Sequence, residues 1–186
     1  TFGVDHNTVI GIIAGGDTAI RKAVENAEDN DTQAWIDLQK YSLTANDSVI
    51  GIAASGRTPY VIGGLLTAKE HNIITGCITC NSNTILSQSC DYPVEAVVGP
   101  EYVTGSTRMK AGTAQKLILN MISTAIMIKL GKVRGNKMVD MQMSNEKLVQ
   151  RAIKMVIEET NVSFEIAEQA IKTHGSVRKA IDELSQ

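Results

Sequence analysis

A short loop of small and hydroxyl-bearing side chains, residues 54–58, follows an unbroken apolar stretch in this 186-residue chain. The hydroxyl groups of Ser55 and Thr58 are donors that phosphate oxygens accept. Gly56 lets the backbone approach a ligand closely, and Arg57 adds a positive charge. Where such a loop joins a buried strand to a helix, backbone N–H groups and the helix dipole converge on an anion. The loop therefore predicts a phosphate site, although an ordinary turn in which Thr58 only caps the helix has the same composition.

The same loop lacks the spacing of the two best-known nucleotide motifs. A Walker A loop needs Gly, four residues and then Gly-Lys-Ser/Thr, and the dinucleotide fingerprint needs Gly-x-Gly-x-x-Gly after a strand. The glycines Gly11, Gly15 and Gly16 do not have that spacing either. The sequence gives weak support to ATP and NAD sites.

A second concentration of polar residues lies between Gly105 and Lys116. Ser106 or Thr107 is a possible helix cap, and Arg108 or Lys110 would then place positive charge in the first helical turn, where the dipole disfavours it. An anionic group should compensate. Bound phosphate and the side chain of Glu101 are the two candidates, and the alternative is that both cations extend into water.

Composition narrows the class of protein. With 43% hydrophobic residues, 20% charged residues and a formal net charge of −2, the chain is expected to be globular, with no binding to nucleic acid or membrane. The longest apolar stretch, residues 117–130, is too short and too polar to span a bilayer. No signal-peptide pattern begins the sequence, so a cytoplasmic location is the expectation.

The cysteines and histidines do not predict a metal site. Cys77 and Cys80 have the C-x-x-C spacing, but they end an apolar run that is typical of a strand rather than the helix start of a redox pair. With Cys90 they are interpreted as buried structural thiols. No histidine stands at ligand spacing, so no metal is expected.

Apolar runs alternate with helical patterns over the first hundred residues. We predict strands at 9–14, 49–53, 73–79 and 94–98, with helices at 18–27, 31–39, 59–69 and 82–89. Continuous apolar strands are typical of parallel sheets buried on both faces, so the fold class is α/β. Further helices are predicted at 107–130, 144–158, 163–172 and 176–184. We predict a sugar-phosphate domain at residues 1–140 and a helical subdomain at 141–186.

Residues 49–62 and 104–117 together carry a family resemblance. These strings, with the shorter segments 13–16, 25–29 and 131–140, closely resemble the bacterial N-acetylmuramic acid 6-phosphate etherases. The resemblance covers nearly the whole chain. It implies the sugar isomerase (SIS) fold, a three-layer sandwich with a parallel sheet and here a C-terminal helical appendage, and by analogy with that fold a homodimer.

The resemblance also implies an activity. A lyase of this family cleaves the D-lactyl ether of N-acetylmuramic acid 6-phosphate by elimination and hydration, giving N-acetylglucosamine 6-phosphate and D-lactate in cell-wall sugar recycling. It uses neither a metal nor a redox cofactor. The elimination needs an acid for the departing oxygen and a base for the C2 proton, roles that suit paired carboxyl groups.

Two carboxylates are expected to act in the family, and one of them maps onto Glu28. The other belongs to a segment just before the residue at which this sequence starts, so we expect an N-terminally truncated chain that is a poor catalyst alone. Glu101 is a secondary candidate, with a salt bridge to Arg108 or Lys110 as its alternative role. The predicted substrate- and phosphate-binding residues are Ser55, Gly56, Arg57, Thr58, Ser106, Thr107, Lys110 and Glu101.

Two other functions remain open at the level of the sequence. A non-catalytic phosphosugar-binding regulatory protein of the SIS family would need the loop at 54–58 but not Glu28. An interaction module in the helical tail, residues 161–184, is the third hypothesis, although such tails more often pack on their own domain.

Overall fold

The computed structural model describes residues 2–185, which divide into two compact units. Residues 11–121 form the α/β unit, and the residues before and after them form the helical unit. The boundary falls inside the long helix α5, Lys110–Lys129.

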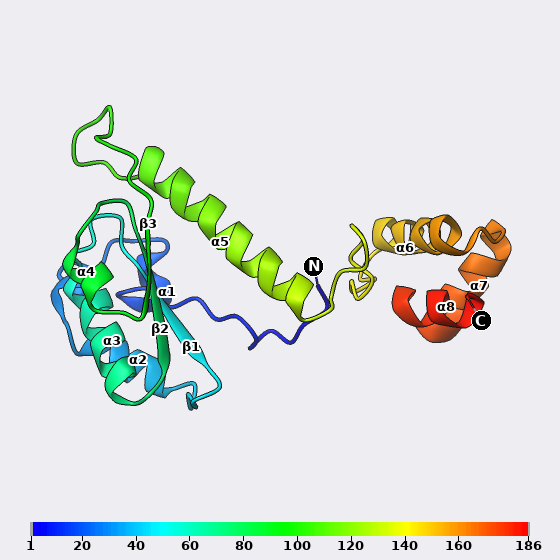
Figure 1. Cartoon of the computed structure of the whole chain (residues 1–186), viewed down its shortest axis with the longest axis horizontal. Coiled ribbons are helices and arrows are strands. Elements are labelled where there is room, and N and C mark those ends of the chain that lie inside the picture. Colours follow the sequence, from blue (N-terminus) through cyan, green and yellow to red (C-terminus); the bar gives the residue numbers. More distant parts are fainter. Residues whose placement is uncertain (1, 186) are drawn as a thin grey trace. The chain divides into compact units, whose positions relative to one another are not determined.

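The α/β unit is built on a parallel sheet of three strands, in the order β1-β2-β3. Strand β1 is Ser48–Ile52, β2 is Ile74–Thr79 and β3 is Tyr92–Glu95. Helix α3, Pro59–Glu70, packs on β1 and β2, and the short helix α4, Ile85–Gln88, packs on β2 and β3. Helix α2, Gln33–Gln39, packs on α3 (Figure 1). The α/β class with a parallel sheet is confirmed.

The core of this unit lies between the sheet and α3. Gly51 is buried where α3 crosses β1, and a methyl group there would fall 2.7 Å from the side chains of Val61 and Leu65. The cluster beside it contains Ala53, Leu65, Cys77, Leu86 and Cys90. Because side chains alternate along a strand, the opposite face carries Ile50, Ile52 and Ile74, which remain 38–52% exposed.

Two predicted elements before β1 are not present as predicted. Residues 9–14 form no strand, because within the described chain no segment pairs with them and a strand needs a neighbour for its backbone hydrogen bonds. The helix predicted at 18–27 is reduced to α1, Gly16–Ala19, and the 3-10 turn η1, Ala27–Asp29. The last strand begins two residues earlier than predicted and contains Pro93, which is tolerated at the edge of a sheet.

The helical unit contains α6, Glu146–Thr160, α7, Phe164–His174, and α8, Val177–Leu184. Each helix has an N-cap residue whose side chain accepts a hydrogen bond from a backbone N–H group of the first turn. These N-cap residues are Asn145, Ser163 and Ser176. The buried core combines the three helices with the segment before them: Val139, Met141, Ala152, Ile153, Val156, Ala167, Ile171, Val177, Ala180 and Ile181. Residues 139–141 therefore pack with the helices that follow them, and the predicted C-terminal helices are confirmed.

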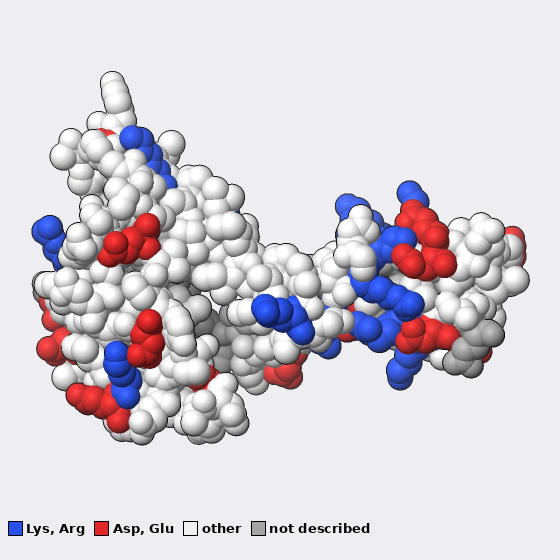
Figure 2. Space-filling model, in the orientation of Figure 1, with Lys and Arg blue, Asp and Glu red and all other residues white. Residues whose placement is uncertain are grey.

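The surface of the helical unit carries both signs of charge close together (Figure 2). Several of these charges form ion pairs, including Lys137 with Glu158 and Glu159. Among residues 2–185, every helix is too short or too polar to span a bilayer.

Candidate functional site

The loop between β1 and α3 presents unpaired donors at the carboxyl edge of the sheet. Within residues 2–185, the backbone N–H groups of Ser55, Thr58 and Tyr60 make no hydrogen bond to another group of the chain. Thr58 stands at the start of α3, but its side chain makes no capping hydrogen bond. The hydroxyl group of Thr58 is therefore not used in capping the helix. Free amides, a free hydroxyl and a helix start are the elements of an anion site.

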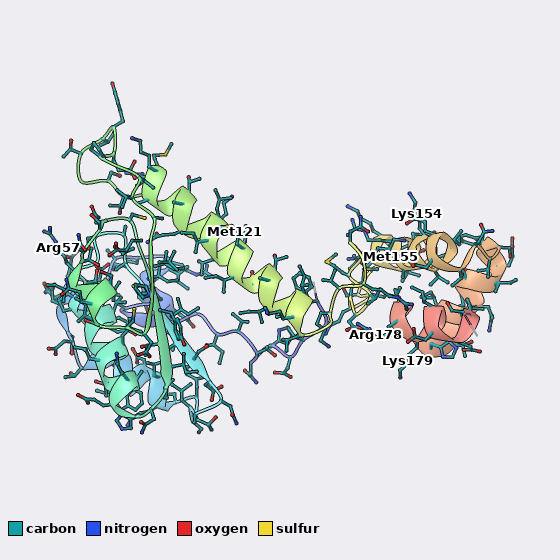
Figure 3. All side chains as sticks on the ribbon, in the orientation of Figure 1. Arg57, Met121, Lys154, Met155, Arg178 and Lys179 are labelled. Carbon is teal, nitrogen blue, oxygen red and sulfur yellow. The ribbon has the colours of Figure 1, made fainter. Side chains whose placement is uncertain are left out.

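Two other side chains belong to this predicted phosphate site, residues 54–60, which we name the phosphate cradle. Ser55 is exposed, and its Oγ accepts a hydrogen bond from the backbone N–H of Arg57 at 3.2 Å. The Oγ retains its own proton as a donor for a ligand. Arg57 extends from the α/β unit into solvent, which leaves its charge free to meet an incoming anion (Figure 3).

Gly56 has a structural role within the cradle. It is buried, with φ of 68°, and a methyl group on it would lie 2.4 Å from the Cβ atom of Thr84. Its N–H donates to the carbonyl of Ala53, and its carbonyl accepts from the N–H of Leu86. Gly56 thus fastens the turn to the start of α4, where the Oγ1 atom of Thr84 accepts from the N–H of Ser87 at 3.0 Å.

The carbonyl of Ala54 fixes the loop to the end of the neighbouring strand. It accepts hydrogen bonds from the N–H of Cys80 at 3.0 Å and from the side-chain amide of Asn81 at 2.9 Å. The Thr79 hydroxyl donates to the same oxygen at 3.3 Å. The backbone at the base of the cradle is therefore held rigidly by β2.

Glu101 occupies the start of helix α5. Its two carboxylate oxygens accept hydrogen bonds from the N–H groups of Lys110 and Ala111, both at 3.0 Å. These backbone hydrogen bonds lower the pKa of Glu101, with a smaller contribution from the charge of Lys110. The compensating anion at this helix start is thus the protein's own carboxylate.

The two cations near this helix start, Lys110 and Arg108, have different hydrogen-bond partners. The ammonium group of Lys110 donates to the carbonyl of Pro100 at 2.9 Å, and the guanidinium of Arg108 donates to the Oγ atom of Ser106 at 2.9 Å. Helix α5 begins at Lys110, three residues later than predicted, so Arg108 lies outside it. A direct role of Ser106, Thr107, Lys110 or Glu101 in binding stays a prediction.

A pocket of about 200 Å³ opens where these loops meet, beside the cradle. Its wall comes from the segments that follow all three strands and from the start of α5, and it includes Ala54, Asn81, Val98, Glu101, Thr104 and Thr107. Ligands of open parallel sheets gather at this carboxyl edge. The shared residue Ala54 makes the pocket and the cradle contiguous.

Glu28 lies in the turn η1 with its side chain exposed, and η1 packs against α3. The segment that follows it lies very close to that helix, since a methyl group on Gly63 would fall 1.8 Å from the carbonyl oxygen of Asp31. The structure therefore places the Glu28 segment along the helix that begins in the cradle. The catalytic role of Glu28 stays a prediction.

The three cysteines are free and buried, as predicted. Burial, followed by a hydrogen bond with Cys90, raises the pKa of Cys77 to about 12. A protonated, buried thiol is a poor nucleophile. Among residues 2–185 no group of three His, Cys, Asp or Glu side chains is arranged to hold a metal ion.

Sequence reasoning missed Asn81, Asp37 and Tyr60. Asn81 follows β2 within two residues, so the rule that ligand sites form at strand ends points to it. The phenol of Tyr60 donates to the carboxylate of Asp37 at 2.9 Å across 23 residues of sequence. No local pattern marks such a pair.

Comparison with known proteins identifies the relatives of this chain. The family model described as the glucokinase regulatory protein N-terminal SIS domain matches residues 1–69. The N-acetylmuramic acid 6-phosphate etherases of Christiangramia forsetii and Bacteroides thetaiotaomicron are 63% and 59% identical over 182 residues, which is 98% of this chain and 66% of each relative. The chain thus spans just under two thirds of their length. The etherase of Porphyromonas gingivalis is 55% identical over all 186 residues, 68% of its own length. With its fold, its strand-end loop and these relatives, the chain belongs to the N-acetylmuramic acid 6-phosphate etherase family.

Proposed function

We propose that the protein acts on N-acetylmuramic acid 6-phosphate and cleaves its D-lactyl ether, giving N-acetylglucosamine 6-phosphate and D-lactate. Family membership supports the reaction, and the phosphate cradle supports the substrate class. The proposal depends on one observation: the backbone N–H groups of Ser55, Thr58 and Tyr60 are unpaired among the described residues. Beside them, the hydroxyl group of Thr58 makes no capping hydrogen bond. These donors suit a phosphate group at the mouth of α3.

The proposed reaction divides the substrate between the cradle and the pocket. With the phosphate held by residues 55–58, the sugar ring extends over the carboxyl edge of the sheet. A base removes the C2 proton, the bond from the sugar to the lactate oxygen breaks, and an acid protonates that oxygen. Water then adds across the double bond. Glu28 supplies one of the two carboxyl groups.

Glu101 is less suited to proton transfer than Glu28. Both of its oxygens are engaged by amides of α5, and these hydrogen bonds favour the ionised form. We propose that Glu101 shapes the pocket wall while it holds the start of the helix.

Binding is tested by titration with N-acetylglucosamine 6-phosphate, with free N-acetylglucosamine as the comparison. We expect the phosphate to be required, and we expect Thr58→Val to weaken binding about tenfold because one hydrogen bond to a charged group is lost. Thr67→Val, on the same helix about two and a half turns further along, is the matched control and should bind normally. Equal affinity for the sugar with and without phosphate would contradict the proposal.

Catalysis is tested by measuring D-lactate release from N-acetylmuramic acid 6-phosphate. Both the 186-residue chain and a protein extended to the relatives' length are assayed, because the chain spans 66% of the first relatives. We expect D-lactate release by the protein with Glu28 and no release by the Glu28→Gln variant. Binding without release at either length would instead support a non-catalytic phosphosugar sensor.

We also propose that the protein forms a homodimer. The exposed apolar side chains of Ile50, Ile52, Ile74 and Val94 on one face of the sheet support an interaction surface in the α/β unit. Sedimentation velocity, read against the chain mass of 20.0 kDa, distinguishes a dimer from a monomer.

A further inference from the structure

A partly buried hydrogen bond joins helix α2, which follows the Glu28 turn, to the helix that begins at the phosphate cradle. Tyr60 lies in the first turn of α3, two residues after Thr58, and is only 6% exposed. Its hydroxyl group donates to the Oδ2 atom of Asp37 in α2 at 2.9 Å. Burial raises the pKa of Tyr60, so the phenol remains a donor at all physiological pH values.

Asp37 is held in place by two further donors. Its Oδ1 atom accepts from the side-chain amide of Gln33 at 3.0 Å and from the ammonium group of Lys40 at 2.8 Å. Burial opposes the charge, but the hydrogen bonds from Lys40, Tyr60 and Gln33 lower the pKa of Asp37 overall. The acceptor for Tyr60 is therefore an oriented carboxylate, and such charge-assisted hydrogen bonds are stronger than neutral ones.

The chain between Glu28 and Asp37 is short and internally braced. The side-chain oxygen of Asn30 accepts from the N–H groups of Thr32 at 3.0 Å and Gln33 at 3.1 Å, which links the turn η1 to the start of α2. This segment also packs directly on α3, where a methyl group on Gly64 would lie 2.8 Å from the Cβ atom of Ala34. A shift of α2 relative to α3 would therefore move the turn that holds Glu28.

We infer that Tyr60 and Asp37 are positioning residues that fix the Glu28 segment relative to the phosphate cradle, through the hydrogen bond between α3 and α2. Tyr60 is the last residue of the cradle and lies in the first turn of α3, so the bond to Asp37 fixes α2 against the end of α3 where the substrate phosphate is expected. The inference rests on the proposed function in taking Glu28 as the catalytic carboxylate. A displacement of about 1 Å in a catalytic group lowers a rate by up to about 100-fold.

The test compares Tyr60→Phe with Tyr41→Phe. The first variant removes only the buried hydroxyl group that Asp37 accepts. The second removes a hydroxyl group from a tyrosine that is 45% exposed just after α2, and it is the matched control. Asp37→Asn retains an oxygen that can accept from Tyr60, so it should behave nearer to the unchanged protein than Asp37→Ala.

Two measurements are made on each variant, at whichever chain length releases lactate. We expect Tyr60→Phe to lower kcat about 10- to 100-fold, with KM and the affinity for N-acetylglucosamine 6-phosphate changed less than about twofold. Amide hydrogen exchange over residues 27–37 should become about tenfold faster, while the strands keep their protection. Tyr41→Phe should leave kcat, KM, the affinity and the amide exchange unchanged.

The outcomes separate this inference from the proposed function. Unchanged exchange over residues 27–37 in Tyr60→Phe overturns the positioning role, and so does a raised KM with unchanged kcat, because that result places the effect on the cradle. If neither chain length releases lactate, the proposed function fails. The exchange measurement then still decides whether the bond fixes the segment.

Discussion

At the level of single residues, Gly56 in the cradle stabilises the turn, and its own N–H group is not available to a ligand. Gly56 is expected from the sequence to let the backbone approach a phosphate, but its own N–H is bonded to Ala53 and its Cα faces Thr84. The groups left for a ligand belong to its neighbours Ser55 and Thr58. Gly56 contributes by making the turn possible.

Gly56→Ala should therefore destabilise the α/β unit and abolish phosphosugar binding. The side chain would be forced into a left-handed conformation, with φ of 68°, and into the Cβ atom of Thr84 at 2.4 Å. We expect a loss of about 2–4 kcal/mol in the free energy of unfolding, from the conformational cost together with the overpacking. Urea denaturation measures it.

The control for that variant is Gly131→Ala. Gly131 has nearly the same φ, 70°, but among the described residues no atom beyond its two chain neighbours lies within 4 Å of the position that a methyl group would take. It therefore isolates the conformational cost, about 1 kcal/mol. Equal losses for the two variants would mean that the contact with Thr84 does not matter.

At the scale of elements, the start of α5 shows how a helix obtains its compensating anion. The sequence left open whether a bound phosphate or Glu101 fulfils this role for the polar stretch after Gly105. In the structure both oxygens of Glu101 accept from the first amides of the helix, so the carboxylate of Glu101 is the compensating anion there, and anion binding stays a prediction for the cradle at α3. The two helix starts are therefore not equivalent, although both follow small and hydroxyl-bearing residues.

Glu101→Gln should loosen the first turn of α5 and remove part of the pH dependence of stability. The hydrogen bonds lower the pKa of Glu101 below its ordinary value of 4.5. The carboxylate therefore contributes its full stabilisation above about pH 4.5, and this is lost as the pH falls through the lower pKa of the folded protein. Amide exchange at Lys110 and Ala111, followed from pH 7 to pH 3, measures the effect.

In Glu101→Gln, exchange at those two amides should be faster at pH 7 and should approach that of the unchanged protein at low pH. Glu70→Gln, at the far end of α3, is the control because no hydrogen bond joins its carboxylate to the chain among the described residues. A difference from the unchanged protein that persists undiminished at pH 3 would show that the charge of Glu101 is not responsible.

At the scale of the whole molecule, the chain contains two units with separate cores. One core lies between the sheet and α3, and the other is formed by α6, α7 and α8 with residues 139–141. Arg178 of α8 ties the segment before α6 to this second core. Its guanidinium forms a two-point contact with Asp140 at 2.7 and 3.0 Å, and it also donates to the carbonyl of Gly131.

Arg178→Ala should weaken the helical unit and leave the α/β unit unchanged. Asp140 loses its two-point partner, although Lys132 remains 3.4 Å away. We expect a loss of about 1–2 kcal/mol in the local stability of α6–α8, since the contacts are charge-assisted but partly exposed. Amide exchange in α6–α8, compared with exchange in the three strands, measures the loss.

The matched control is Lys179→Ala, at the next position of α8, where the side chain is exposed and forms no ion pair among the described residues (Figure 3). It should leave exchange in both units as it is. Faster exchange in the strands of Arg178→Ala would contradict the independence of the two cores.

The local pattern of the sequence predicts a strand correctly where the folded chain supplies a neighbouring strand to pair with it. The apolar runs that became β1 and β2 are continuous and end in small residues, which is typical of parallel strands under a helical layer. The equally apolar run at residues 9–14 forms no strand, since composition does not specify a pairing partner. Helices α6, α7 and α8 were predictable because their caps and apolar stripes are local signals.

The parallel α/β class and the family were predictable from the sequence alone, because turn signals, apolar runs and long similar strings are local properties of the chain. The phosphate-binding role of the loop stays a prediction. The packing of the elements was needed to show that Glu101 accepts from the first amides of α5, whereas amides of the cradle have no partner among the described residues. It also brought Asn81 to Ala54 and Asp37 to Tyr60, across 27 and 23 residues. Such contacts depend on how β2 packs beside β1 and how α2 packs beside α3. The types of the residues do not specify which distant segments come together.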